Sequence, residues 1–509
     1  MSRARSAHRR GLTKRPADTL ATVTRRRFYL LLGLIVLLGF AVRMAYLLLV
    51  KWDQPIWGDA FTYHYTANGI ADGLGIQSWV PDVFKQLTDR VPRTWGLHAN
   101  ANGVAAENPP LFPLYLSAFS FVGLRSFHAH MVAQTLLGTA SVFVMGLVGR
   151  KVMSPRVGLL AALIAAVYAN FWIYDPLVIS ESMGILAGAV MVLMAYRAWE
   201  RPKLANMVWL GVTFGVAALV RSEFVLLMPL VVIPLVIRAM PGRAVKERIG
   251  YVAASGAVAL LVVSPWVVRN LTTFDRPTFL SHDAGLSLRS GSCHEAFYGV
   301  SIGWWSPECV IHGRPPAGDP SVRDDYWRDL GTTYIGDHLD RFPLVALARV
   351  GRMWEVYNPG TPWGEIRGGQ TLGFTIVEGR SEKAARLALA QAWLLFPLSI
   401  AGFVLLWRRK RPVTPLLALP ILVSIVSVFA FGSPRYRSVA EVAIVTTAAV
   451  TIDALITRFW SKRSPADPDA ASSESGPSDN GPPGGSPPDA DAPSAGPAGG
   501  ANEPELQPV

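Results

Sequence analysis

Carboxylates and arginines stand at the ends of several long apolar runs in this sequence, where charged side chains are costly and usually serve a function. Asp59 comes shortly after the first run, in the stretch "IWGDAFTYHY" at 56–65. The others are, in chain order, Asp175, Glu181, Arg221, Glu223, Arg269, Arg435 and Arg437. A carboxylate can take a proton from an acceptor hydroxyl, and arginines can hold a phosphate and stabilise its charge as it departs. Together these groups predict a transferase that uses a lipid-phosphate donor.

Each of these residues receives an expected role in this hypothesis. Asp59 is the catalytic base, and Arg269, Arg435 and Arg437 bind the donor phosphate. The remaining candidates, which we expect to line the site, are Tyr63, Asp175, Glu181 and Arg221. For any single arginine, a contact with a lipid headgroup or an interfacial ion pair explains the position equally well.

The composition supports a membrane location for these residues. The chain of 509 residues is 51% hydrophobic and only 17% charged, and its mean hydropathy is +0.30. These values are too apolar for a soluble protein and predict an all-α polytopic membrane protein. The net charge of +12 lies in short clusters between apolar runs, which is typical of membrane topology signals and argues against nucleic-acid binding.

About ten transmembrane helices are expected from the apolar runs. They cover 28–50, 127–148, 157–174, 178–196, 205–220, 222–240, 249–268, 387–407, 413–431 and 437–457. The connections that carry clustered arginines and lysines, such as "RRKR" at 408–411, then all fall on one side. By the positive-inside rule this side is cytoplasmic. We therefore expect a multi-pass protein of the plasma (inner) membrane with both termini in the cytoplasm and the active site on the extracytoplasmic face.

The expected domains follow from this topology. Residues 1–27 form a basic cytoplasmic segment, and 28–457 form the transmembrane domain with two long extracytoplasmic loops, 51–126 and 269–386. Residues 464–509 are rich in Pro, Gly, Ser and Asp, so they bury too little apolar surface to fold and are expected to be a disordered cytoplasmic tail.

Interfacial helices are expected inside these loops. From Asp59 onward, one helical face is predicted before Gly73 and Gly75 end it. Further on, the prolines of "ENPPLFPLYL" at 107–116 are expected to exclude regular helix.

Cysteine occurs twice, as Cys293 and Cys309, and both residues lie in the second long loop. An extracytoplasmic location favours a disulfide between them; a pair of free thiols is the alternative. Their spacing is loose for a structural zinc site, even with His294 and His312 nearby.

Several motifs together resemble a known family. They are the acidic residue after the first span with "YTANGIADGLG", then "NPPLFPLYL", "ISESMGI", "LVRSEFVLLMPL", "SPWVVRNLTTFDRPTFLS" and "GSPRYRSVAEVAIV". In order and spacing they are similar to the GT-C superfamily of integral-membrane glycosyltransferases, and in particular to bacterial relatives of the protein O-mannosyltransferases and of the lipid A aminoarabinose transferase.

This resemblance implies a polyprenyl-phosphate sugar donor, transfer of a hexosyl or pentosyl group on the extracytoplasmic face, and inversion at the anomeric carbon. It places Asp59 as base or acceptor-positioning group, Glu181 as the acidic residue near the fourth span, and Arg435 and Arg437 as the late-loop arginines. The chain departs from the mannosyltransferases at Ala60, where those enzymes carry an Asp-Glu pair, and its second loop is shorter than the soluble domain of the aminoarabinose transferase. The acceptor therefore stays open among a cell-envelope glycan, a lipoglycan and a protein.

Cofactors and rival functions complete the expectations. No metal ligand set is predicted, although some relatives hold a divalent ion near the site, and His64, His282, His294 or His312 are candidate ligands for one. A transporter or flippase for a lipid-linked saccharide is the main rival, and a glycan polymerase or ligase is the second. No Walker or Rossmann phosphate loop is present, which argues against a nucleotide-driven pump.

Overall fold

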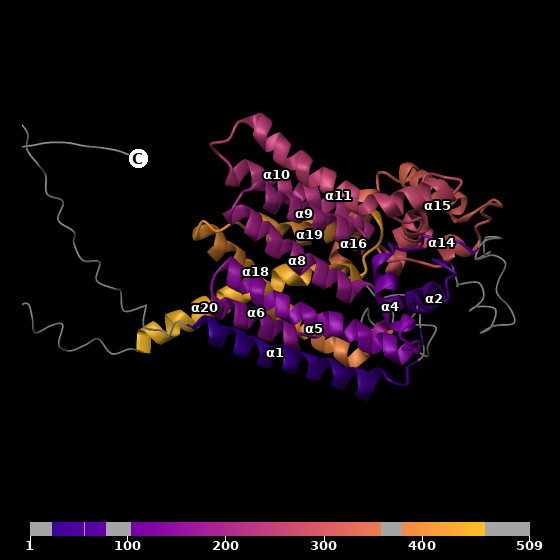
Figure 1. Cartoon of the computed structure of the whole chain (residues 1–509). Coiled ribbons are helices and arrows are strands. Elements are labelled where there is room, and N and C mark those ends of the chain that lie inside the picture. The colour runs from indigo at the N-terminus through magenta and orange to yellow at the C-terminus, as the bar shows by residue number, and fades with distance from the viewer. Residues whose placement is uncertain (1–22, 55, 57, 78–102, 358–378, 464–509) are drawn as a thin grey trace, which may run out of the picture. The chain divides into compact units, whose positions relative to one another are not determined.

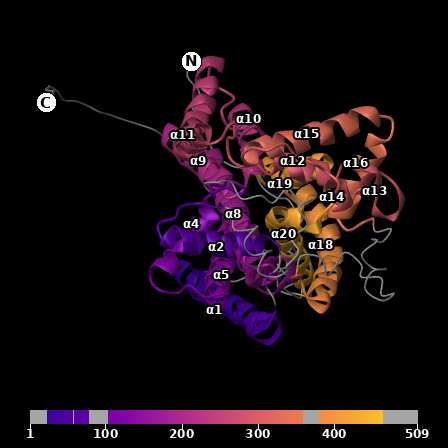
Figure 2. The same cartoon turned by 90° about the vertical axis from the view of Figure 1, so that its right-hand side faces the viewer.

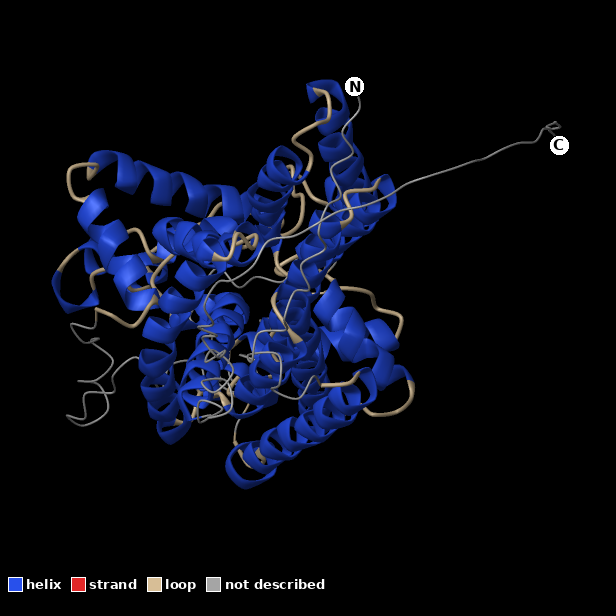
Figure 3. Ribbon diagram, turned by 90° about the vertical axis from the view of Figure 1, so that its left-hand side faces the viewer, coloured by secondary structure: helices blue, strands red, loops and turns tan. Residues whose placement is uncertain are grey.

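The computed structural model describes residues 23–54, 56, 58–77, 103–357 and 379–463, with only the backbone for 460–463. Most of the predicted basic N-terminal segment, parts of both long loops and the predicted tail lie outside these ranges. The described residues form helices joined by loops, and their only β-type pairing is an isolated bridge between Gln77 and Val104; Figure 3 shows this all-helical architecture. The predicted all-α class is confirmed.

Within these described ranges, seven helices are long and apolar enough to cross a membrane. They are α1 (Arg25–Tyr46) with its π-helical extension η2 (Leu47–Lys51), α5 (Phe127–Val152), α8 (Glu181–Glu200), η5 (Ser222–Leu226) with α10 (Leu227–Ala239), α11 (Val245–Thr273), α18 (Glu382–Arg408), and η8 (Pro434–Ala440) with α20 (Glu441–Arg463). An eighth candidate is α6 (Pro155–Val167) followed by α7 (Ala169–Trp172) and η4 (Asp175–Leu177), which bends by 72° at the break. Three further apolar helices of the described residues are shorter: α4 (Leu111–Phe121), α9 (Leu204–Ala218) and α19 (Thr414–Phe429).

Each of the ten predicted spans overlaps one of these helices, but the count of ten is not confirmed. Only seven or eight pass as spans, because α9 and α19 are short for a hydrocarbon core of about 30 Å. The predicted third span, 157–174, is not one continuous helix, because the chain bends after Val167. The polytopic architecture itself is confirmed.

The long helices differ in how deeply the protein buries them. In α20 and its leading turn η8, 72% of the most apolar stretch is buried, against 17% in α11. Peripheral helices expose large apolar side chains, such as Leu34 and Leu37 on α1, which suits contact with lipid tails. Figure 1 shows α5, α6 and α8 running alongside α1.

Short helices gather at one end of the long ones, on the right in Figure 1. The first group is α2 (Asp59–Ala71) and α4 (Leu111–Phe121). The second is α12 (Ala284–Ser290), α13 (His294–Phe297), η6 (Gly299–Ser301), α14 (Glu308–Ile311), α15 (Pro320–Asp337) and α16 (Phe342–Met353). Figure 2 shows the two groups on opposite sides of the end of α8.

The first group tests two local predictions. Helix α2 begins at Asp59 and ends just before Gly73 and Gly75, whose φ angles of 78° and 72° suit glycine, so the predicted helix is confirmed. The prediction of no helix in 107–116 is wrong from Leu111 onward. Pro110 precedes α4 and Pro113 lies in its first turn, where the missing N–H would have no intrahelical partner anyway.

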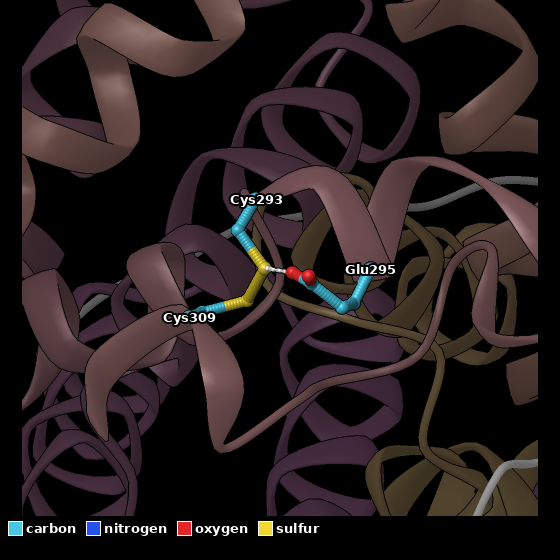
Figure 4. A group of neighbouring side chains, drawn as sticks. All are labelled: Cys293, Glu295 and Cys309. Carbon is cyan, nitrogen blue, oxygen red and sulfur yellow. Dashed lines mark hydrogen bonds between the residues drawn. A yellow bond between two sulfur atoms is a disulfide. The ribbon is translucent and has the colours of Figure 1, made fainter. Parts of the chain in front are cut away.

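In the second group, Cys293 and Cys309 are joined by a disulfide with an S–S distance of 2.03 Å. Figure 4 shows the side chain of Glu295 against this bond. The same three residues form the one group of potential metal ligands found among the described residues. Because each sulfur is bonded to the other, these thiols are not metal ligands here.

Candidate active site

A cavity of about 940 Å³ lies where six of the long elements have an end. Its wall includes the end of η2, the start of α5, the turn before α8, the start of η5, the end of α19 and the start of η8. The charged and amide side chains on this wall are Lys51, Asp59, Glu107, Asn108, Arg221, Glu223, Asp283, Arg328 and Arg435, with Gln54 beside them. Segments far apart in sequence thus contribute both carboxylates and cations to one space.

An ion-pair network connects five side chains at the cavity: Asp59, Glu181, Arg221, Glu223 and Arg435. Arg435 donates from Nη2 to Asp59 Oδ2 at 2.7 Å and from Nε to Glu181 Oε1. The same Glu181 oxygen accepts from Arg221 Nη1 at 2.8 Å, and Arg221 Nε donates to Glu223 Oε1 at 2.6 Å. Asp59 and Glu181 therefore hold Arg435 between them.

Glu181 anchors this network from below the cavity surface. Its side chain is fully buried, and it is the first residue of α8, where the helix dipole favours a negative charge. A buried carboxylate is tolerable when two guanidiniums pair with it. Asp59, in contrast, has 45% of its side chain exposed, and no described residue donates to its Oδ1. One oxygen of Asp59 thus faces open space.

Arg437 lies two residues after Arg435 but has a different environment. It is 1% exposed, and its partners are Glu441 at 2.8 Å and Glu355 at 2.9 Å. Since a 3₁₀-helix has three residues per turn, positions i and i+2 of η8 point in different directions. Arg437 is not part of the cavity wall.

Asp175 is also placed away from the wall. It pairs with Arg43 of α1 at 2.8 Å, and both side chains are buried. Its Oδ1 accepts from the hydroxyl of Ser182 at 2.5 Å, one residue after Glu181. A Cβ atom on Gly138 would lie 2.1 Å from Asp175 Oδ2, so glycine is needed there. Asp175 supports the turn that presents Glu181.

Arg269 serves another loop. It donates to the carbonyl of Ala105 at 3.0 Å and to Asn270 Oδ1 at 2.8 Å. His282 pairs with the next residue: its Nε2 accepts from Ala106 N at 3.0 Å, and its own N donates to Ala106 O at 2.9 Å. Arg269 and His282 thus hold the segment that carries Glu107 and Asn108 into the cavity.

Tyr63 and Arg221 lie on the cavity wall as expected, one on α2 and the other just before η5. Burial raises the pKa of the Tyr63 phenol above its ordinary value, and the charge of Asp59 raises it further. Tyr63 therefore stays protonated and can donate a hydrogen bond at neutral pH.

Sequence reasoning missed six of the charged and amide residues on the wall: Lys51, Gln54, Glu107, Asn108, Asp283 and Arg328. Lys51 looks like an ordinary interfacial end to the first span, and Glu107 and Asn108 stand in a motif interpreted only for its prolines. Asp283 gives no signal in the sequence. Burial raises the pKa of Asp283 well above its usual range, and the charges of Glu107, Asp324 and Asp59 add to this effect.

One wall of the cavity is apolar. It is formed by Val225 and Leu226 of η5 and by Ile425, Val426 and Phe429 of α19. Leu226 and Phe429 are 42% and 59% exposed. The cavity thus has an apolar wall beside the charged network.

The four histidines considered as metal ligands are not on the cavity wall. His64, His130, Ser120 and Asn68 form a closed cycle of hydrogen bonds. The Nδ1 atoms of the two histidines are 3.0 Å apart. This cycle of hydrogen bonds links α2 to α4 and α5. His294 stacks on Tyr298, and His312 is exposed beside Glu308.

Comparison with known proteins identifies the fold. Residues 107–268 match the family model for dolichyl-phosphate-mannose-protein mannosyltransferase. The oligosaccharyltransferase of Archaeoglobus fulgidus superposes with a TM-score of 0.51 at 15% identity, covering 86% of this chain and 52% of that one. The chain has the GT-C fold.

The chain spans about half the length of the oligosaccharyltransferase it matches. ArnT from Cupriavidus metallidurans, bound to undecaprenyl phosphate, gives a TM-score of 0.38 at 15% identity, covering 85% of this chain and 79% of that one. No curated protein sequence gives a significant match. The expected resemblance to the GT-C superfamily is confirmed.

Proposed function

We propose that this GT-C protein transfers a glycosyl group from a polyprenyl-phosphate sugar to an extracytoplasmic acceptor, with inversion at the anomeric carbon. The observation that carries the proposal is the cavity in which Asp59 and Arg435 meet beside an apolar wall. A lipid-linked sugar consists of a reacting anomeric carbon, a phosphate and an apolar chain. These three parts match Asp59, Arg435 and the apolar wall of the cavity in turn. The family model that matches 107–268 is named for a dolichyl-phosphate sugar, which is a donor of this class.

In the proposed step, an acceptor hydroxyl oxygen attacks the anomeric carbon from the side opposite the phosphate. The bond between that carbon and the phosphate oxygen breaks, and its electron pair stays on the phosphate. Asp59 takes the hydroxyl proton, through the oxygen that no described residue contacts. The phosphodiester of the donor, with one negative charge, becomes a monoester with two.

Arg435 couples the two ends of this reaction. It holds Asp59 before transfer, and protonation of Asp59 removes the charge that attracts this guanidinium. At the same moment the departing phosphate gains a charge, and Arg435 can bind it through a planar fork. Glu181 keeps the other edge of Arg435 in place.

The charge distribution supports an extracytoplasmic site. Several helices have their first residues near the cavity and basic residues in their last turns. These basic residues include Lys151 of α5, Arg197 of α8 and Arg238 of α10. Because basic residues mark the cytoplasmic side, this distribution supports the proposal that the cavity opens on the opposite face.

In this proposal the sugar and the acceptor bind at the polar wall of the cavity. Asn108, Asp283 and the hydroxyls of Ser222 and Ser281 lie there, and such groups hydrogen-bond sugar hydroxyls. A hexosyl or pentosyl donor and a glycan, lipoglycan or protein acceptor all fit this chemistry.

The test compares two acids of the same helix. Membranes that carry wild type, Asp59→Asn or Asp72→Asn are incubated with radiolabelled polyprenyl-phosphate sugars, and label in non-lipid envelope material is counted. Asp72 closes α2 on the surface, where it pairs with Arg125. We expect Asp59→Asn to lower transfer by about 10²–10⁴-fold and Asp72→Asn to leave it unchanged. Wild-type rates in Asp59→Asn would remove the assigned base.

A further inference from the structure

Lys51 is a buried cation on the cavity wall. It is 2% exposed, lines the cavity, and is the last residue of η2, the π-helical end of α1. A π-turn places one more residue in a turn than an α-helix does, and such turns are rare and concentrate at functional sites. The end of the first span thus brings an ammonium group to the cavity rather than to the bulk interface.

The bonding of Lys51 is incomplete. Its Nζ donates to the carbonyl oxygen of Gly379, whereas an ammonium group has three N–H donors. Within the part of the chain that the structure describes, no carboxylate lies within ion-pair distance of it. Arg221 and Arg435 on the same wall, in contrast, are each paired with two carboxylates.

The charge balance of the network shows what this ammonium can add. Asp59, Glu181 and Glu223 supply three carboxylates, and Arg221 and Arg435 supply two guanidiniums. Taken as ionised, these five groups carry one negative charge in excess and repel an anion. A further positive charge that faces the cavity therefore favours phosphate binding. Arg328 lies on the same wall but pairs with Asp324 and Asp325. Lys51 supplies that charge without a carboxylate that must first be displaced.

We propose that Lys51 binds the phosphate group of the polyprenyl-phosphate carrier. This inference rests on the proposed function and assigns the anion contact of the same cavity to a residue of the first span. A buried, unpaired ammonium group gains most from a ligand that neutralises it, because an uncompensated charge inside a protein is costly. The phosphate monoester left after transfer, with two negative charges, is the form that Lys51 favours most.

The experiment measures binding of undecaprenyl phosphate to the purified full-length protein in nanodiscs. Lys51→Gln removes the charge but keeps a donor for the Gly379 carbonyl, and Lys51→Arg keeps the charge. Lys151→Gln is the matched control, because Lys151 is partly exposed, pairs with Glu200 and lies about 36 Å along α5 from its cavity end. We expect Lys51→Gln to weaken binding by roughly ten- to a hundredfold, Lys51→Arg to weaken it less, and Lys151→Gln to bind like wild type.

The possible failures are distinguishable. Equal affinity in Lys51→Gln and wild type would overturn the role of Lys51 alone, whereas no binding by wild type would count against the proposed function as well. Displacement by inorganic phosphate or phosphatidylglycerol at the same concentration as the carrier would show a general anion site and overturn the assignment to the carrier.

A second measurement covers the case in which Lys51→Gln does not fold. The ³¹P resonance of bound undecaprenyl phosphate should then differ between Lys51→Arg and wild type, because a guanidinium fork replaces a point charge beside the phosphate. An identical resonance in the two proteins would overturn the proposal.

Discussion

Arg435 and Arg437 lie two residues apart in η8, yet they belong to opposite kinds of charged cluster. Arg435 lines the cavity and pairs with a half-exposed carboxylate, Asp59, whereas Arg437 is sealed between Glu441 and Glu355. Both guanidiniums are ion-paired, so pairing does not separate a functional arginine from a structural one. The difference is access, because only Arg435 has a partner whose charge can change when a ligand enters.

We call Arg437, Glu441 and Glu355 the sealed cluster. Substitution of its arginine should have the largest effect, a loss of stability. Arg437→Gln leaves Glu441 buried without its guanidinium partner, which costs about 3–5 kcal/mol. The thermal midpoint in detergent should fall strongly. Transfer per folded molecule should change little, and a large loss of it would break the comparison.

We call Arg435, Asp59 and Glu181 the open cluster. Substitution of its arginine should lower transfer activity and leave stability nearly unchanged. Arg435→Gln removes the cation that meets the departing phosphate, and we expect transfer to fall by about 10²–10³-fold. Glu181 keeps Arg221 as a partner, so the thermal midpoint should stay near that of wild type. Unfolding of Arg435→Gln as severe as that of Arg437→Gln would show that the two arginines share one structural role.

The support beneath the open cluster can be disturbed separately. Gly138→Ala forces its Cβ against Asp175 and should destabilise the protein by about 1–3 kcal/mol. It should also lower transfer, since Asp175 supports the turn before Glu181. Gly33→Ala on α1 is the control, because a Cβ there meets nothing within 4 Å. Equal melting of the two variants would show that Asp175 has room to move.

A pH-dependent effect is expected for the loop held by His282. Burial lowers the pKa of His282 from 6.5 to about 4, so the unfolded chain binds a proton that the folded chain does not. The stabilisation is complete above pH 6.5 and is lost as the pH falls toward 4, by about 1.4 kcal/mol per pH unit at most. Melting curves across this range should show a shallower slope for His282→Gln, and an unchanged slope would contradict this reasoning.

Much of the fold follows from apolar periodicity and charge. Runs of about 20 apolar residues bounded by arginines and lysines predict helices and their order, and glycines mark the end of α2. The bend between α6 and α7 could not be predicted, because Tyr168 and Asn170 do not break a helix by their own preferences. Its stabilising pair, Arg43 and Asp175, joins residues 132 positions apart in the sequence.

The site was predictable only in part, for a related reason. Asp59, Arg221 and Arg435 share the cavity because each stands next to the same end of a long helix. That rule also admits Arg269 and Arg437, which the structure places elsewhere, because position along a helix does not give direction around it. Lys51 reaches the cavity at the end of a π-helical turn, and no simple sequence pattern predicts such a turn.

The most direct test of the central claim is the pool of lipid-linked sugars in cells that lack this protein. Lipids extracted from a deletion strain should contain an accumulated polyprenyl-phosphate sugar. Expression of wild type or Asp72→Asn in the deletion strain should return this lipid-linked sugar to its normal level. Expression of Asp59→Asn in equal amount should not. A deletion strain with an unchanged pool, or full correction by Asp59→Asn, would contradict the account.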